Sequence, residues 1–353
     1  MKCSVFLVTL ALACTLPATA LLAQQPKVTN AQFHSEPVSA GLSASIEKLD
    51  SSTAPLWAGY EVQALSRTHL SACWSQSGDE CCNEFRLEDT TGDVNISDHS
   101  DEQSPTAYVL LRVDHGAVTR VRSAPAGCTL NAGGLRLEWL TDVKPEDSVV
   151  FLAALASKHG DDSDNRDLDG SLAALAMHAT PKATEVLASL ADPSHPEHLR
   201  EKAAFWLGAQ RGHEGLLALQ KLVAKEPDAG LRRKLAFDLS VNSDPAATDE
   251  LIRMAKSDPE GGVRGQAIFW LAQKAGKKAI AAMQDAMEND PDFEVKKKAV
   301  FALSQLPKDE SVTQLMHVAD TNQNPKIRKE AIFWLGQTND PRALAYLEDI
   351  LKR

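Results

Sequence analysis

The sequence lacks the short motifs on which many enzyme classes depend. Its 353 residues contain no G-x-S-x-G nucleophile turn, no H-E-x-x-H zinc helix, no G-x-x-x-x-G-K-[ST] phosphate loop and no G-x-G-x-x-G dinucleotide fingerprint. Each motif fixes a nucleophile, a metal ligand or a phosphate-binding backbone at one point of a fold. We therefore expect a protein that is not an enzyme and that has no cofactor.

Positive charge is scarce. The chain has 37 Lys and Arg against 48 Asp and Glu, a net charge of −11. Acidic residues outnumber basic ones by 18 to 9 in residues 26–150 and by 30 to 27 after residue 150. Nucleic-acid binding requires clustered cations that displace counterions from phosphates. The composition argues against a nucleic-acid partner.

Long apolar runs are missing except near the N-terminus, where the run is too short to cross a bilayer. Lys2 precedes an apolar stretch at 5–16, and small residues then offer cleavage after Ala20 or Ala23. Residues 1–23 are therefore predicted to be a signal peptide, with no membrane span. The protein is expected to be exported, either periplasmic or extracellular.

Cysteine is absent after residue 128. Once the signal peptide is removed, four cysteines remain: Cys73, Cys81, Cys82 and Cys128. In an oxidising compartment this even number indicates two disulfides. A bridge between the neighbours Cys81 and Cys82 would be strained, so each is expected to pair with Cys73 or Cys128, and the sequence leaves the pairing open. The alternatives are a zinc site, which the missing CxxC spacing disfavours, and a thiol-based sensor built on Cys81 and Cys82.

The region after the signal peptide combines a linker with a β-rich segment. Residues 24–55 are rich in small and polar residues with little periodicity and are predicted to be a linker. Apolar residues at 108–113 and alternating residues at 118–122, on either side of an Asp-His-Gly turn, predict a hairpin, and a third strand is expected at 135–140. We assign 56–144 to a small β-rich, cysteine-containing domain. Its apolar content is thin for its size, which fits stabilisation by disulfides.

A helix is predicted within residues 145–160. Pro145 opens it, and two acidic residues follow at its positive end. Leu155 lies 32 residues before Leu187, in phase with the repeats that follow. We expect this helix to cap the first repeat and shield it from water.

The remaining residues, 161–353, repeat every 32 positions. Five segments align without a gap: LREKAAFWLG at 199–208, LRRKLAFDLS at 231–240, VRGQAIFWLA at 263–272, VKKKAVFALS at 295–304 and IRKEAIFWLG at 327–336. A second helix keeps the same register at Leu187, Leu219, Leu251, Met283, Leu315 and Leu347. Self-similarity of this length indicates a solenoid, in which no unit can bury its apolar face alone.

With a degenerate first unit at 168–190, the pattern predicts an α-solenoid of about six helix pairs. The predicted repeat core is Phe205, Trp206, Leu207, Phe237, Leu239, Phe269, Trp270, Leu271, Phe301, Leu303, Phe333, Trp334 and Leu335.

The pattern [LVI]-[RK]-x-x-A-[AVI]-F-[WA]-L-[GAS] and the Asp-Pro helix starts resemble HEAT repeats, in particular the short bacterial type grouped with phycobilisome-lyase-like HEAT proteins. The similarity covers roughly residues 165–353. The whole chain, with its predicted signal peptide and cysteine-containing domain, resembles exported bacterial HEAT-repeat proteins. The resemblance implies a protein-binding scaffold and supplies no catalytic residue.

One basic residue stands near the start of each aligned segment: Arg200, Arg232, Arg264, Lys296 and Arg328. One interpretation is a basic stripe for an anionic ligand. The resemblance implies a different role, in which such a base bonds acidic groups of neighbouring repeats, here Asp258 and Asp290. One charge per unit that is matched by acids favours this structural ladder.

Tryptophan recurs in every second segment, at Trp206, Trp270 and Trp334. These side chains could form a row of anchors for a partner. Their position on the apolar arc of the helix favours core packing instead.

Two enzyme families also have HEAT repeats. Proteins similar to deoxyhypusine hydroxylase bind two irons through His-Glu pairs, whereas here only His213-Glu214 has that dipeptide. Relatives of bilin lyases hold a tetrapyrrole, which fits an exported protein poorly. We therefore predict a non-enzymatic scaffold for a protein or peptide partner. A metal-dependent hydroxylase, another oxidoreductase or a lyase is the runner-up.

Overall fold

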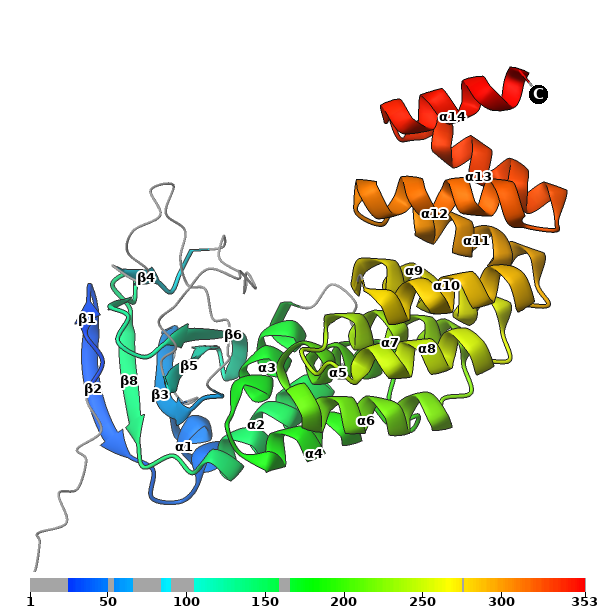
Figure 1. Ribbon diagram of the computed structural model, residues 1–353. Coiled ribbons are helices and arrows are strands. Elements are labelled where there is room, and N and C mark those ends of the chain that lie inside the picture. The colour runs from blue at the N-terminus through cyan, green and yellow to red at the C-terminus, as the bar shows by residue number, and fades with distance from the viewer. Residues whose placement is uncertain are drawn as a thin grey trace, which may run out of the picture.

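The computed structural model describes residues 25–49, 54–65, 84–89, 105–158, 166–274 and 276–352. A β-rich region at the N-terminal end of the molecule leads into a stack of helices that runs to the C-terminus (Figure 1). The predicted order, a β-containing region followed by an α-solenoid, is confirmed.

The main sheet has five strands in the order β2-β8-β3-β5-β6. Their bounds are Gln32–Pro37 for β2, Arg136–Thr141 for β8, Leu56–Gln63 for β3, Thr106–Asp114 for β5 and Ala117–Pro125 for β6. β8 lies parallel to both β2 and β3, while β3, β5 and β6 are antiparallel. The predicted hairpin is therefore present, as β5 and β6. Its turn places His115 and Gly116 at φ 44° and 84°, the backbone that tight two-residue hairpins need.

The prediction that residues 24–55 form a linker is wrong for most of that stretch. It contains β1 (Val28–Thr29), β2 and helix α1 (Leu42–Leu49). β2 extends the main sheet along β8, and α1 buries Leu42, Ile46 and Leu49. These three residues are spaced for one helix face, a short signal that the polar composition around it obscured.

Alternating residues bury the main sheet on both faces. On β3, Ala58, Tyr60 and Val62 belong to the core shared with the helices, whereas Trp57 belongs to a second core on the other face. The second core is closed by a small parallel sheet of β1, β7 (Leu130–Asn131) and β4 (Phe85–Arg86).

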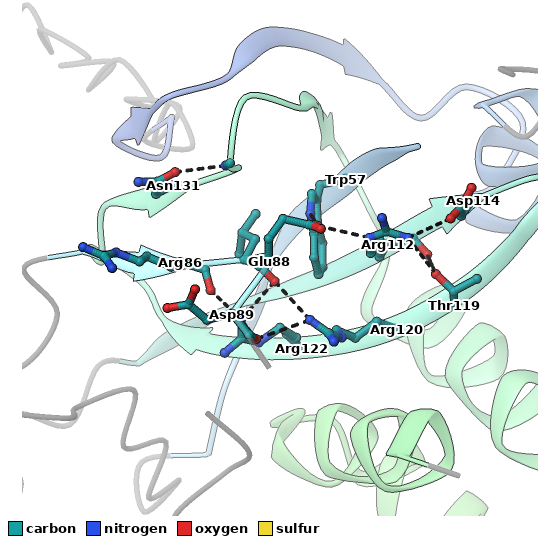
Figure 2. Close-up of polar contacts among 12 residues, drawn as sticks. Trp57, Arg86, Glu88, Asp89, Arg112, Asp114, Thr119, Arg120, Arg122 and Asn131 are labelled. Carbon is teal, nitrogen blue, oxygen red and sulfur yellow. Dashed lines mark hydrogen bonds and ion pairs between the residues drawn. The ribbon is translucent and has the colours of Figure 1, made fainter. Parts of the chain in front are cut away.

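The segment 84–89 is fastened to the outer face of the sheet by polar contacts (Figure 2). Glu88 Oε1 accepts hydrogen bonds from Trp57 Nε1 at 2.7 Å and from Arg112 Nε at 3.1 Å. Arg122 Nη1 donates to the carbonyl of Arg86 at 2.6 Å. Arginines of the hairpin thus supply backbone partners to a segment that has little sheet of its own.

Six helix pairs follow helix α2 (Pro145–Lys158). They are α3 (Arg166–Met177) with α4 (Pro181–Leu190), α5 (Glu197–Gln210) with α6 (Gly212–Lys225), α7 (Ala229–Val241) with α8 (Ala247–Ser257), α9 (Gly261–Lys274) with α10 (Lys277–Asn289), α11 (Phe293–Ser304) with α12 (Lys308–Thr321), and α13 (Pro325–Gln337) with α14 (Pro341–Lys352). We call the odd-numbered members first helices and the even-numbered members second helices. The predicted number of pairs is confirmed. No helix within the described ranges is long and apolar enough to cross a membrane.

The β-rich region and the solenoid share one apolar core. α2 packs against α3 and α4, and α3 lies along β6. A Cβ on Gly170 would come within 2.4 Å of the Val121 carbonyl oxygen, so glycine is what permits this close approach. The sheet, together with α2, therefore covers the first helix pair.

Candidate binding groove

A groove of about 1040 Å³ lies along the second helices α4 and α6. The turns before α4, α6 and α8 and the end of α5 complete its wall. Its apolar lining includes Ala188, Ala209, Leu217, Ala218 and Leu222. Leu217 is 40% exposed, so the groove offers apolar surface to a ligand.

Charged side chains of both signs surround this apolar lining. Lys221 and Lys225 follow Leu217 at successive turns of α6, which places the three on one edge of the helix. Glu185 and Asp192 stand at the α4 side. The pKa of the Asp192 carboxyl is lowered by the Ser194 backbone amide and hydroxyl, so this rim residue is anionic.

Arg211 forms part of the wall and is itself 8% exposed. It donates from Nε to Thr184 Oγ1 at 2.8 Å, and from Nη1 to the carbonyls of Ala176 and His178 at 3.0 and 2.5 Å. Its Nη2 donates to the carbonyl of Thr180 at 3.0 Å. Burial lowers the pKa of this guanidinium to about 10. Carbonyls at the end of α3, and not a carboxylate, thus hold the charge of Arg211 under the groove.

His213 and Asp244 connect α6 to the turn before α8. His213 Nδ1 lies 2.6 Å from Asp244 Oδ2, and Asp244 Oδ1 accepts a hydrogen bond from the Ala246 amide at 2.8 Å. The Ala246 amide and then His213 lower the pKa of the Asp244 carboxyl, which keeps it ionised. The imidazole is therefore fixed on one side while 64% of the His213 side chain remains exposed.

The described part of the chain contains no group of three or more His, Cys, Asp or Glu side chains placed to hold a metal ion. His213 and Glu214, the one His-Glu dipeptide of the sequence, lie in the first turn of α6. The groove combines apolar surface, fixed charges and one oriented imidazole, a set suited to recognition of a ligand.

The basic column lies at the turns that join successive helix pairs. Arg200 pairs with Glu226, Arg232 with Asp258 and Arg264 with Asp290, each across 26 residues. Arg264 Nε to Asp290 Oδ2 is 2.7 Å, and Nη2 to Oδ1 is 2.9 Å. Asp258 and Asp290 thus pair with basic residues of this column, Arg232 and Arg264. This pairing favours the structural ladder over a stripe for an anionic ligand.

Arg232 and Arg264 also bind the turn that precedes their own helix. Arg232 Nη1 donates to the carbonyls of Glu226 and Pro227 at 3.1 and 2.9 Å. Each of these two arginines therefore ties together the two turns at either side of one helix pair.

The last two members of the column are bound differently. Lys296 Nζ donates to the Glu288 carbonyl at 2.6 Å, and Arg328 Nη1 to the carbonyls of Asn322 and Gln323 at 2.9 and 3.2 Å. Asn322 occupies the position that Glu226 and its successors occupy in earlier repeats. Asn322 therefore offers no carboxylate to the side chain at position 296, where a lysine replaces the arginine of earlier repeats.

The predicted repeat core is only partly buried. The leucine column, Leu207, Leu239, Leu271, Leu303 and Leu335, is buried throughout. The phenylalanine column is not. Its first four members, Phe205, Phe237, Phe269 and Phe301, are half-buried, each against an aromatic ring of the next first helix. The core prediction is wrong for Phe333, which is 54% exposed because α13 is the last first helix described.

Trp206 is 7% exposed, and Trp270 and Trp334 are half-buried. In the same column Asp238 is 3% exposed, and its Oδ2 has no hydrogen-bond partner among the described residues. Burial raises the pKa of the Asp238 carboxyl well above its usual value, with Lys234 acting in the opposite direction. We conclude that this carboxyl holds its proton more tightly than an exposed one.

A buried hydrogen-bond chain that no sequence pattern predicted joins the sheet to the solenoid. Tyr60 OH lies 2.8 Å from Ser148 Oγ, which in turn lies 2.9 Å from His178 Nε2. His178 Nδ1 lies 2.7 Å from the Ala174 carbonyl. Burial raises the pKa of Tyr60 and lowers the pKa of His178 to about 4. The three side chains come from β3, α2 and the turn after α3, so no local pattern could have revealed them.

Three of the predicted disulfide residues, Cys73, Cys81 and Cys82, lie outside the described residues, as does the predicted signal peptide. Cys128 is 1% exposed in the second core of the β-rich region. The disulfide pairing remains a prediction.

Comparison with known proteins gives HEAT repeats at residues 248–332 and 280–353. Among solved structures, the complex of CpcE and CpcF of phycocyanin lyase from Nostoc sp. PCC7120 is 21% identical, covering 44% of this chain and 99% of that chain with a TM-score of 0.32. Human deoxyhypusine hydroxylase in complex with glycerol is 17% identical, covering 58% and 90% with a TM-score of 0.27. These scores are too low to carry a functional argument. No curated protein matches the sequence.

Proposed function

With HEAT repeats over residues 248–353 as the premise, we propose that this protein is an exported, non-enzymatic scaffold that binds a protein or peptide partner in the groove along α4 and α6. The observation that carries the proposal is the groove itself, which offers apolar lining among charged side chains of both signs. Repeat solenoids commonly present such extended surfaces to partners.

The groove runs along two helices and the turns that flank them, which suits an extended peptide segment. Its volume, about 1040 Å³, is just above the range of about 300–1,000 Å³ that small-molecule pockets usually occupy. Apolar side chains of a peptide would contact Leu217 and Leu222. Lys221 on α6 and Asp192 after α4 carry opposite charges, and they would fix the direction of the peptide by pairing with its charged groups.

A selection from a random peptide library tests this proposal. Peptides enriched on the full-length protein are expected to lose about tenfold or more in affinity for the Leu217→Asp variant, which places a charge in the apolar lining. Leu344→Asp is the matched control, because Leu344 lies on the second helix α14 and is 61% exposed. Enriched peptides that bind both variants equally, or no enrichment at all, would contradict the proposal.

Export is proposed from the leader-like residues 1–23. Cell fractionation with an antibody against the full chain is expected to find it outside the cytoplasm and shortened at its N-terminus. Full-length protein in the cytoplasmic fraction would overturn this part of the proposal.

A further inference from the structure

The first helices carry a continuous line of aromatic rings, most of them half-buried. We call it the aromatic strip, and it consists of Phe205, Trp206, Phe237, Phe269, Trp270, Phe301, Phe333 and Trp334. In the three helices where a Trp follows the Phe, the two rings meet edge-on, as in Phe269 and Trp270 with ring centres 4.9 Å apart. The strip lies on the first helices, whereas the groove lies along the second helices α4 and α6. A function of the strip is therefore independent of the function proposed for the groove.

Contacts between repeats make this line continuous. Phe205 stacks on Phe237 with ring centres 6.1 Å apart, and Phe237 meets Trp270 at 4.9 Å. Phe301 repeats the second contact with Trp334, also at 4.9 Å. The rings therefore step from one first helix to the next, and exposure rises to 54% at Phe333.

Basic residues accompany the strip on the same helix face. The positions four and three residues before each Phe hold Glu201 and Lys202, Arg233 and Lys234, Gly265 and Gln266, Lys297 and Lys298, and Lys329 and Glu330. Residues at these spacings share a face of a helix. Six of these ten positions are basic and two are acidic, so this face is net positive in a chain whose net charge is −11.

Ion pairs neutralise three of these six basic residues. Lys202 pairs with Asp169, Lys234 pairs with Glu201 and Lys297 pairs with Glu294. Arg233, Lys298 and Lys329 are exposed and have no acidic partner within the described ranges. Unneutralised positive charge therefore lies along α7, α11 and α13, beside rings that are half-buried or exposed.

We propose that the aromatic strip from α7 to α13 is a second docking surface, and that its partner is an acidic polypeptide segment with interspersed apolar side chains. Carboxylates of the partner would meet Arg233, Lys298 and Lys329, and its apolar side chains would cover Phe301 and Phe333. Charge of the opposite sign guides such a segment to the strip, and burial of the rings supplies affinity.

The arrangement of the rings favours a polypeptide over single-stranded nucleic acid. Bases bind such proteins by stacking on open aromatic faces. Here Phe205 and Phe237 lie within 10° of parallel and Phe269 and Phe301 within 4°, so these rings already stack on each other.

Fluorescence anisotropy on the full-length protein tests the proposal. The probe is a labelled peptide of about 20 residues that repeats Glu-Leu-Glu-Glu-Leu, a length that spans several repeats. The comparison probes are the same peptide with Lys in place of Glu and a single-stranded DNA of similar length. We expect binding of the acidic peptide only, weakened by salt, because exposed charges are screened.

Two triple variants each reverse three charges, one set on the first helices and the other on the second helices. Arg233→Glu/Lys298→Glu/Lys329→Glu is expected to weaken binding about tenfold or more. Lys277→Glu/Lys278→Glu/Lys308→Glu, on second helices, makes the same change in net charge and is expected to leave affinity within about twofold. Phe333→Ser, at an exposed position, is expected to weaken binding about fivefold through lost apolar burial.

Three outcomes would overturn the proposal. Absence of binding by the acidic peptide at millimolar concentration refutes the docking surface, and equal affinity for the two charge-reversal variants refutes its location. DNA that binds as tightly as the acidic peptide refutes the class of partner. Circular dichroism of every variant shows whether the fold is retained. Because the groove variants leave this face unchanged, failure here is distinguishable from failure of the groove proposal.

Discussion

Arg232 and Asp258 form a two-point ion pair between a first helix and the turn that leads to the next repeat. Arg232 Nε lies 2.8 Å from Asp258 Oδ2, and Nη2 lies 3.0 Å from Oδ1. The side chains are 9% and 5% exposed. Asp258, with other carboxylates nearby, raises the pKa of this guanidinium, so Arg232 stays charged.

Replacing Arg232 with Met is expected to destabilise the solenoid by about 3 kcal/mol or more, because Asp258 would remain buried without its partner. Urea unfolding followed by circular dichroism measures the loss. Arg328→Met is the matched control. Among the described residues, Arg328 donates to two backbone carbonyls and to no carboxylate, and its replacement is expected to cost about 1 kcal/mol. Equal losses in the two variants would show that the ion pair contributes nothing beyond backbone capping.

Asp238→Asn tests the buried carboxyl between Trp206 and Trp270. Because the pKa of Asp238 is raised in the folded protein, the folded state binds more protons than the unfolded state above about pH 4. The wild-type free energy of unfolding, relative to the variant, is therefore expected to fall as pH rises above about 4. Urea unfolding of both proteins at a series of pH values measures this difference. A difference that stays constant with pH would contradict the account of this residue.

His178 predicts a pH dependence of the opposite sign. Its pKa is lowered from 6.5 to about 4 by burial, with Arg211 adding to the effect and Glu146 opposing it. Between pH 6.5 and about pH 4, the unfolded state therefore binds a proton at His178 that the folded state does not. The free energy of unfolding is expected to fall as the pH decreases through this range. The loss should approach about 3 kcal/mol relative to His178→Gln, from about 1.4 kcal/mol per pKa unit. Thermal melts of both proteins across this range test it, and parallel curves would contradict it.

Gly208 and Gly336 occupy the same position in two repeats and are predicted to respond in opposite ways to alanine. A Cβ on Gly208 would lie 2.3 Å from the Asp238 carbonyl oxygen, so Gly208→Ala must push α5 and α7 apart. A Cβ on Gly336 meets nothing within 4 Å. Gly208→Ala should therefore destabilise by about 2 kcal/mol, and Gly336→Ala should stabilise by up to about 1 kcal/mol through helix propensity. The melting temperatures of the two variants test this prediction. A shift of the same sign in both variants would contradict it.

The sequence predicted the solenoid because the repeat is regular. Leu207 and Leu239 face the same environment in successive units, so their spacing reports a packing position directly. The interpretation of Asp258 and Asp290 as partners of the basic column came from the resemblance to HEAT repeats, and the structure brings these residues together.

Other features depend on contacts between distant segments, which periodicity does not report. β2 was read as part of a linker because its order comes from pairing with β8, about 100 residues later in the chain. Tyr60 and His178 are joined only through Ser148 of α2. Phe333 was assigned to the core by its column, although burial in that column depends on a ring from the next repeat. Regular spacing thus identified the helix pairs but not how the first and last of them are covered.

Hydrogen exchange of the full-length protein, with and without a peptide selected on it, tests the central claim that the groove is the binding surface. The account predicts slower amide exchange in α4 and α6, the helices that line the groove, and unchanged exchange in α12 and α14. Protection confined to α12 and α14, or no protection anywhere with peptide bound, would contradict it.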